Sequence, residues 1–102
     1  MNFEWLPLAL RHLDEIYYYY SQYSTKSAKN IINQIIQNAG ICQHFPNIGK
    51  TEPLLQSFTP TFRSLISYQG RYKIIYYREN NDIFIASIWD CRQDPAKFER
   101  HI

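Results

Sequence analysis

The hydrophobic side chains of this sequence change their spacing once, near residue 60, and that change constrains the fold most. Between residues 28 and 42 they recur at helical intervals: Ala28, Ile31, Ile32, Ile35, Ile36, Ala39 and Cys42. Such i, i+3, i+4, i+7 spacing places one apolar stripe along a helix. Phe45-Pro46 ends this helix, because the residue before a proline is disfavoured in the helical conformation.

After Pro60 the hydrophobic spacing becomes two, which is typical of β-strands. Three runs follow this pattern: Phe62–Ser67, Tyr72–Arg78 and Ile83–Trp89. Short turn sequences separate them, at residues 68–71 and 79–82. The pattern therefore predicts a three-strand antiparallel meander.

The segment before residue 28 adds a strand and a helix. Asn2–Trp5 can form a short strand, and Leu6-Pro7 opens a helix that runs to about Tyr23. Ser24 or Thr25 is a natural N-cap for the next helix, so the two helices form an antiparallel hairpin.

At the other end of the chain, Asp94-Pro95 supplies an N-cap and first residue for a short final helix. The predicted fold is α+β: an N-terminal strand, an antiparallel helical hairpin packed on a small antiparallel sheet, and a short C-terminal helix. One face of the sheet takes the hairpin, and the other can be an open, functional surface.

The chain has 102 residues, which predicts a single domain. No apolar run approaches the roughly 20 residues of a membrane span, and the N-terminus lacks the features of a signal peptide, so we expect a cytoplasmic protein. Cys42 and Cys91 lack metal-ligand spacing and are expected to be reduced thiols. No metal and no cofactor are predicted.

The excess of positive charge lies in the C-terminal part of the chain. Residues 1–62 hold four Lys/Arg and four Asp/Glu, whereas residues 63–102 hold seven against five, which gives the whole net charge of +2. This surplus permits a nucleic-acid partner but does not demand one.

Four consecutive tyrosines, Tyr17–Tyr20, span a full turn of the first helix, so they cannot all face the core. Tyr17 and Tyr20 continue the apolar stripe and are predicted to be buried. Tyr18 and Tyr19 should be partly exposed and are the predicted partner-binding residues. The alternative is that both rings lie flat on their own helix.

The sequence resembles the RelE/ParE toxin superfamily from Trp5 to about Phe98. Six segments carry the resemblance in the right order: Ala9…Leu13…Ile16…Tyr20-Ser21, the long second helix, Phe45-Pro46-Asn47-Ile48-Gly49, Arg63-Ser64-Leu65, Tyr72-Lys73-Ile74-Ile75-Tyr76, and Ile88-Trp89-Asp90-Cys91-Arg92-Gln93-Asp94-Pro95. The resemblance implies the toxin of a type II toxin–antitoxin system, neutralised by an antitoxin whose C-terminal segment wraps over it. RelE-type toxins cleave mRNA in the ribosomal A site, whereas ParE-type toxins poison DNA gyrase.

If the chain is a nuclease, the resemblance implies that Arg63, Lys73 and Arg92 are its catalytic cations. They would point from the open sheet face and together stabilise the charge that develops on a phosphate. The structural alternatives are that Arg63 binds Asp90 or a chain terminus, and that Arg92 holds Asp94.

The sequence departs from the nuclease pattern at several positions. Leu65 stands where relatives often carry a second basic residue, and Lys73 replaces the usual arginine. Phe98 stands near the place of an acid or base, and a phenyl ring cannot transfer a proton. His101 could substitute for it, but terminal residues tend to be poorly ordered.

These departures favour ParE-like inhibition of DNA gyrase by surface binding. The alternatives are a ribosome-dependent mRNA endonuclease and a former toxin that now acts only as an antitoxin-binding or regulatory partner. The expected partners are a cognate antitoxin and either gyrase or the ribosome with its mRNA. A homodimer and a toxin–antitoxin hetero-oligomer are both compatible with the sequence.

Overall fold

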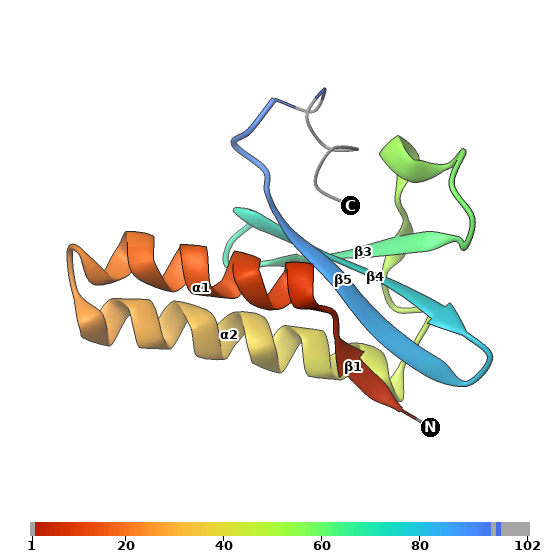
Figure 1. Cartoon of the computed structure of the whole chain (residues 1–102), viewed down its shortest axis with the longest axis horizontal. Helices are drawn as coiled ribbons and strands as arrows, with labels where there is room; N and C mark the ends of the chain where they lie inside the picture. Colours follow the sequence, from red (N-terminus) through yellow and green to blue (C-terminus); the bar gives the residue numbers. More distant parts are fainter. Residues whose placement is uncertain (1, 95, 97–102) are drawn as a thin grey trace.

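The computed structural model describes residues 2–94 and residue 96, and it confirms the α+β fold (Figure 1). The elements follow in the order β1 (Phe3–Trp5), α1 (Pro7–Ser21), α2 (Thr25–His44), β2 (Lys50–Thr51), the 3₁₀ turn η1 (Pro53–Leu55), β3 (Phe62–Ser67), β4 (Tyr72–Glu79) and β5 (Asp82–Asp90). The final helix predicted from Asp94-Pro95 falls mostly outside the described residues. Neither described α-helix is long and apolar enough to cross a membrane.

The sheet is larger than the predicted meander. Its strand order is β1-β5-β4-β3-β2, so the antiparallel meander β3-β4-β5 gains one strand at each edge. β1 pairs with β5 in parallel, with Trp5 opposite Ile85, and the two-residue β2 pairs with β3. β2 lies in the connection before β3 and is too short to give a hydrophobic pattern, so the sequence analysis missed it.

The two helices begin where their sequences predict. Pro7 is the first residue of α1, where its missing N–H costs no helical hydrogen bond. The side chain of Ser24 caps α2, because its hydroxyl oxygen accepts the N–H of Ser27 at 3.1 Å. The short break between the helices folds them into the predicted antiparallel hairpin, which lies along one face of the sheet (Figure 1).

The main core lies between this hairpin and the sheet. The buried side chains of α2 are Ala28, Ile31, Ile35, Ala39 and Cys42, and Ile32 packs against them partly buried. Ile36, predicted to belong to the same stripe, is 43% exposed. The buried stripe of α2 is therefore narrower than the sequence pattern suggests. From the sheet, Tyr72, Ile74 and Tyr76 of β4 face this core.

Tyr76 ties the end of α2 to the sheet. Its fully buried hydroxyl group donates to the carbonyl of Pro46 at 2.8 Å and accepts the N–H of Gly49 at 2.8 Å. The pKa of Tyr76 is raised to about 12, because burial disfavours the phenolate. The Tyr76 hydroxyl group, as both donor and acceptor, therefore holds the chain after α2 against β4.

The opposite face of the sheet carries a second, smaller core and an ion pair whose carboxylate is buried. Leu55 of η1 packs with Phe62, Ile75, Ala86 and Trp89. Beside them the fully buried carboxylate of Glu52 accepts Lys73 Nζ at 2.9 Å and the N–H of Leu54 at 3.0 Å. Burial alone would raise the pKa of Glu52, but these hydrogen bonds outweigh it and hold that pKa below its ordinary value.

The close approach of Tyr76 to Gly49 predicts opposite effects of two alanine substitutions. A Cβ atom at Gly49 would lie 2.7 Å from the ring and hydroxyl of Tyr76 and 2.8 Å from the carbonyl oxygen of Ser64. Gly49→Ala should therefore lower the free energy of unfolding by about 1–3 kcal/mol. The control is Gly40→Ala within α2, where no heavy atom lies within 4 Å, and it should raise that free energy by about 0.5–1 kcal/mol. Denaturant unfolding measures both, and equal effects would contradict the contact.

The buried Glu52 predicts an acid-sensitive fold. A carboxyl whose pKa is depressed on folding adds stability that is present above its unfolded pKa, about 4.5, and is lost as pH falls through the folded pKa. Glu52→Gln should lower the free energy of unfolding at pH 7 by about 1–3 kcal/mol and flatten its fall below pH 5. Glu79→Gln, at an exposed carboxyl, is the control and should leave the acid slope almost unchanged. An identical slope in Glu52→Gln and the unmutated protein would refute the role of this pair.

Candidate functional site

The tyrosine run at the end of α1 is arranged as predicted at its exposed positions. Tyr18 is 68% exposed and Tyr19 is 44% exposed. Tyr17 and Tyr20, predicted to be buried, are only half-buried, and of these two Tyr20 packs against the main core. The ring of Tyr19 contacts the ring of Tyr20 in a T-shaped arrangement, at 4.9 Å between centroids. These exposures confirm that Tyr18 and Tyr19 lie at the surface, and their role in binding a partner stays a prediction.

Tyr23 extends this surface and was missed by the sequence analysis. It is 76% exposed, and its ring lies 5.8 Å from that of Tyr19. The sequence analysis placed it only as the end of the first helix. In the structure α1 ends at Ser21, so Tyr23 lies in the turn between the helices, where most of its ring is exposed.

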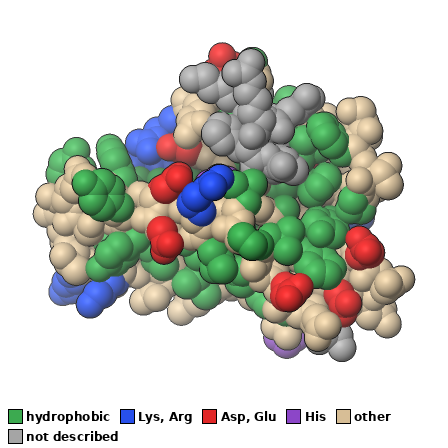
Figure 2. Space-filling model, viewed as in Figure 1, with side chains coloured by type: hydrophobic (Ala, Val, Ile, Leu, Met, Phe, Trp, Pro, Cys, Tyr) green, Lys and Arg blue, Asp and Glu red, His purple; other side chains and the backbone are tan. Residues whose placement is uncertain are grey.

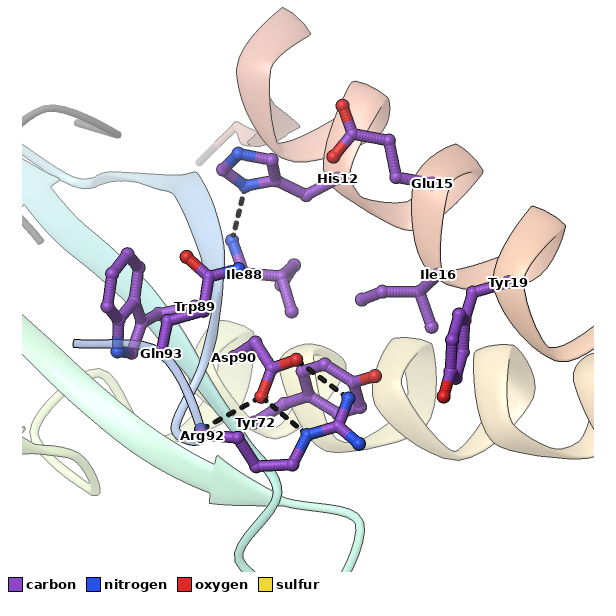
Figure 3. A pocket seen from close by; sticks show the side chains of 10 residues that line it. All are labelled: His12, Glu15, Ile16, Tyr19, Tyr72, Ile88, Trp89, Asp90, Arg92 and Gln93. Carbon is purple, nitrogen blue, oxygen red and sulfur yellow. Dashed lines mark hydrogen bonds and ion pairs between the residues drawn. The ribbon is translucent and has the colours of Figure 1, made fainter. Parts of the chain in front are cut away.

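A groove of about 580 Å³ runs beside this surface, between α1 and the end of β5 (Figure 3). It is lined by His12, Glu15, Ile16, Tyr19, Tyr72, Ile88, Trp89, Asp90, Arg92 and Gln93. The groove is partly apolar and partly charged, which is typical of a site that takes a peptide or another protein surface.

His12 completes the hydrogen bonding of β5 at this groove. β1 pairs with β5 only as far as Ile85, because the chain turns into α1 after Trp5. Beyond that point the buried imidazole of His12 takes over, and its Nδ1 accepts the N–H of Ile88 at 3.0 Å (Figure 3). An accepting Nδ1 carries no proton, so the imidazole acts here as a structural acceptor.

A β-bulge turns Asp90 toward the groove. The pairing of β4 with β5 shifts by one residue between Ile75 and Tyr76, which leaves Ala86 as the extra residue in β5. Ile85 and Ile88 therefore both face the helices, and Trp89 packs on the opposite face. Asp90, two residues after Ile88, returns to the side of the helices.

Asp90 holds Arg92. The two carboxylate oxygens accept Arg92 Nε at 3.0 Å and Nη2 at 2.8 Å, and the backbone N–H of Arg92 adds a third hydrogen bond (Figure 3). Burial alone would raise the pKa of Asp90, but these hydrogen bonds and the charge of Arg92 hold that pKa below its ordinary value. The guanidinium also lies 5.9 Å from the ring centre of Tyr19. The partner of Arg92 is thus Asp90, not the predicted alternative Asp94.

The structure does not bring the three predicted cations together. Arg63 lies opposite Tyr76 in the β3–β4 pairing, so it points to the side of the helices, where its Nη1 donates to the carbonyl of Gly49 at 2.8 Å. Lys73 points to the other face of the sheet, toward Glu52. The expectation that Arg63 and Lys73 share one open face is wrong, because alternation along β4 separates Lys73 from Tyr76.

Within the described residues, no cluster of three or more His, Cys, Asp or Glu side chains could hold a metal ion. Cys42 is buried, and its pKa is raised to about 11 mainly by that burial, so its thiol stays protonated. Leu65, which stands in place of a second cation, packs half-buried against the main core. Phe98 and His101 lie outside the described residues.

The chain is similar to a chain of the solved structure "Chromosomal ParDE TA system from P. aeruginosa", at 23% sequence identity and a TM-score of 0.74, over 88% of this chain and 95% of that chain. At this identity the likeness shows the shared fold. A search of curated protein sequences found no significant relative.

The family comparison covers nearly the whole domain. Residues 3–95 match the model of the ParE toxin of type II toxin–antitoxin systems, parDE. The match includes both helices, all five strands, and the groove and tyrosines described above. The chain belongs to the ParE toxin family of type II toxin–antitoxin systems.

Proposed function

We propose that this ParE-family toxin arrests bacterial growth by inhibiting DNA gyrase through surface binding, without catalysis of its own. The observation that supports this best is the separation of the three cations that a nuclease would need. Arg63 and Lys73 lie on opposite faces of the sheet, and each of the three cations is engaged by a different group. Stabilising the charge of a reacting phosphate requires donors that converge on one point.

A ribosome-dependent mRNA endonuclease is the alternative activity, with Arg63, Lys73 and Arg92 as its catalytic residues. Arg92 is the strongest of the three for this role, because its guanidinium is partly exposed at the end of β5. Lys73 is the weakest, since its ammonium group compensates the buried charge of Glu52. A protein that has lost toxicity and only binds its antitoxin is the third reading.

The antitoxin is proposed to bind across Tyr18 and Tyr19 and along the adjacent groove. Exposed tyrosines provide large contact areas at low cost in conformational entropy. Tyr19 lines the groove as well as the outer surface of α1, so a segment that follows the groove would meet its ring. An extended or helical segment with apolar side chains fits such a surface.

Expression without antitoxin should arrest growth, produce filamentous cells and cause gyrase-linked DNA breaks. Primer extension on translated messages should show no cut within codons, and Arg92→Ala should leave that result unchanged. Message cleavage that is lost in Arg92→Ala would reverse the choice of activity. Normal growth of cells that hold abundant soluble protein would instead support the reading as a protein that has lost toxicity.

Removing either exposed ring should weaken the complex with the antitoxin without unfolding the toxin. Tyr18→Ala and Tyr19→Ala should each cost about 1–2 kcal/mol of binding free energy, which calorimetry can measure. Phe45→Ala is a matched control, because Phe45 is also exposed, at 64%, but lies at the other end of α2. Unchanged affinity in both tyrosine variants would show that the antitoxin does not bind across Tyr18 and Tyr19.

A further inference from the structure

The end of the molecule where α1 passes to α2 carries cations without acids. Two segments build this hairpin end, residues 17–30 and residues 67–72, and together they contain Lys26, Lys29 and Arg71 but no Asp or Glu. Arg71 joins the segments, because its Nη1 donates to the hydroxyl of Tyr20 at 2.7 Å. Figure 2 shows Lys and Arg side chains beside hydrophobic side chains at this end of the molecule.

A row of tyrosine rings leads from Arg71 across the hairpin end. Tyr20, which accepts from Arg71, contacts Tyr19 at 4.9 Å between centroids, and Tyr19 contacts Tyr23 at 5.8 Å. The exposed fraction rises along the row to 76% at Tyr23. Neither the core nor the groove beside β5 uses the ring of Tyr23.

Arg71 and Arg92 line a small pocket of about 190 Å³ at the β3–β4 turn, with Tyr68, Gln69 and Gly70. The turn has three consecutive residues with positive φ, which fold the backbone tightly. Arg71 follows them and lies alongside the end of β5, where its carbonyl accepts the N–H of Cys91 at 2.8 Å. Arg92 is compensated by Asp90. Among the described residues no carboxylate forms a direct ion pair with Arg71, whose hydrogen-bond partner is the neutral Tyr20. The charge of Arg71 is felt by Asp90, but that carboxylate is already paired with Arg92, so the guanidinium of Arg71 can still pair with an anion.

We propose that the hairpin end binds single-stranded nucleic acid. A phosphate would lie at the pocket beside Arg71, neighbouring bases would stack on Tyr19 and Tyr23, and Lys26 would contact the backbone farther along. Exposed ring faces beside uncompensated cations fit an unpaired strand better than a duplex, whose bases are already stacked. This proposal does not rest on gyrase as the target. Tyr19 belongs to this surface and to the antitoxin surface, so a bound antitoxin would cover part of the path of the strand.

Fluorescence anisotropy with a labelled oligothymidylate of about 15 nucleotides tests the proposal on the purified full-length protein. Binding should saturate at low salt. It should weaken with salt at a log–log slope of about −1.4 to −2.1, as two or three phosphate contacts require. Tyr23→Ala and Arg71→Gln should each weaken binding about tenfold.

Two matched controls distinguish binding at this surface from nonspecific binding elsewhere on the protein. Phe45→Ala removes an exposed ring elsewhere, and Arg78→Gln removes an exposed arginine near the β4–β5 turn, so both should bind the strand like the unmutated protein. The proposal is overturned if no saturable binding occurs at low salt, if the controls lose as much affinity as the tests, or if a duplex of equal length binds as tightly. If Arg71→Gln does not fold, as judged by circular dichroism, the oligonucleotide affinities of Tyr23→Ala and Phe45→Ala are compared instead. Equal affinities of these two variants would then overturn the proposal.

Discussion

Burial of the helical hairpin against one face of the sheet is the constraint on which the rest of this structure depends. The hairpin covers Tyr72, Ile74 and Tyr76 of β4, and the hydroxyl of Tyr76 then fixes the chain that leaves α2. Because α1 lies beside the end of β5, the same packing creates the groove that holds Asp90 and Arg92. The outer side of α1 is left to the exposed tyrosines.

Two of the three candidate cations have structural roles in this fold. Lys73 compensates a buried glutamate, and Arg63 satisfies the carbonyl of Gly49 in the connection after α2. Removing either would first disturb the packing of that connection. Arg92 and Arg71 differ, because both reach the surface near Tyr19 and Tyr20. Function by contact with a partner is therefore better supported than phosphate chemistry at a single point.

Much of the fold could be predicted from the sequence because its hydrophobic periods are regular. The stripe of α2, the cap at Ser24 and the meander of β3 to β5 follow from local spacing alone. Within the site, the exposure of Tyr18 and Tyr19 followed from the geometry of one helical turn.

The rest of the site depended on long-range pairing. The face that each cation occupies is set by the register of β3 on β4, and the direction of Asp90 by the bulge at Ala86. A one-residue shift of this kind moves every later side chain of the strand to the other face of the sheet, and the sequence carries no local signal for it. The partnership of Glu52 with Lys73 joins residues 21 positions apart through a connection without regular periodicity, so it could not be predicted either.

The central claim is that this toxin acts by binding gyrase, and the most direct measurement is DNA supercoiling by purified gyrase in the presence of the purified toxin. The account predicts that supercoiling of relaxed plasmid falls as toxin is added, that linear DNA accumulates, and that an equimolar amount of antitoxin restores activity. Undiminished supercoiling at a large excess of folded toxin would contradict it.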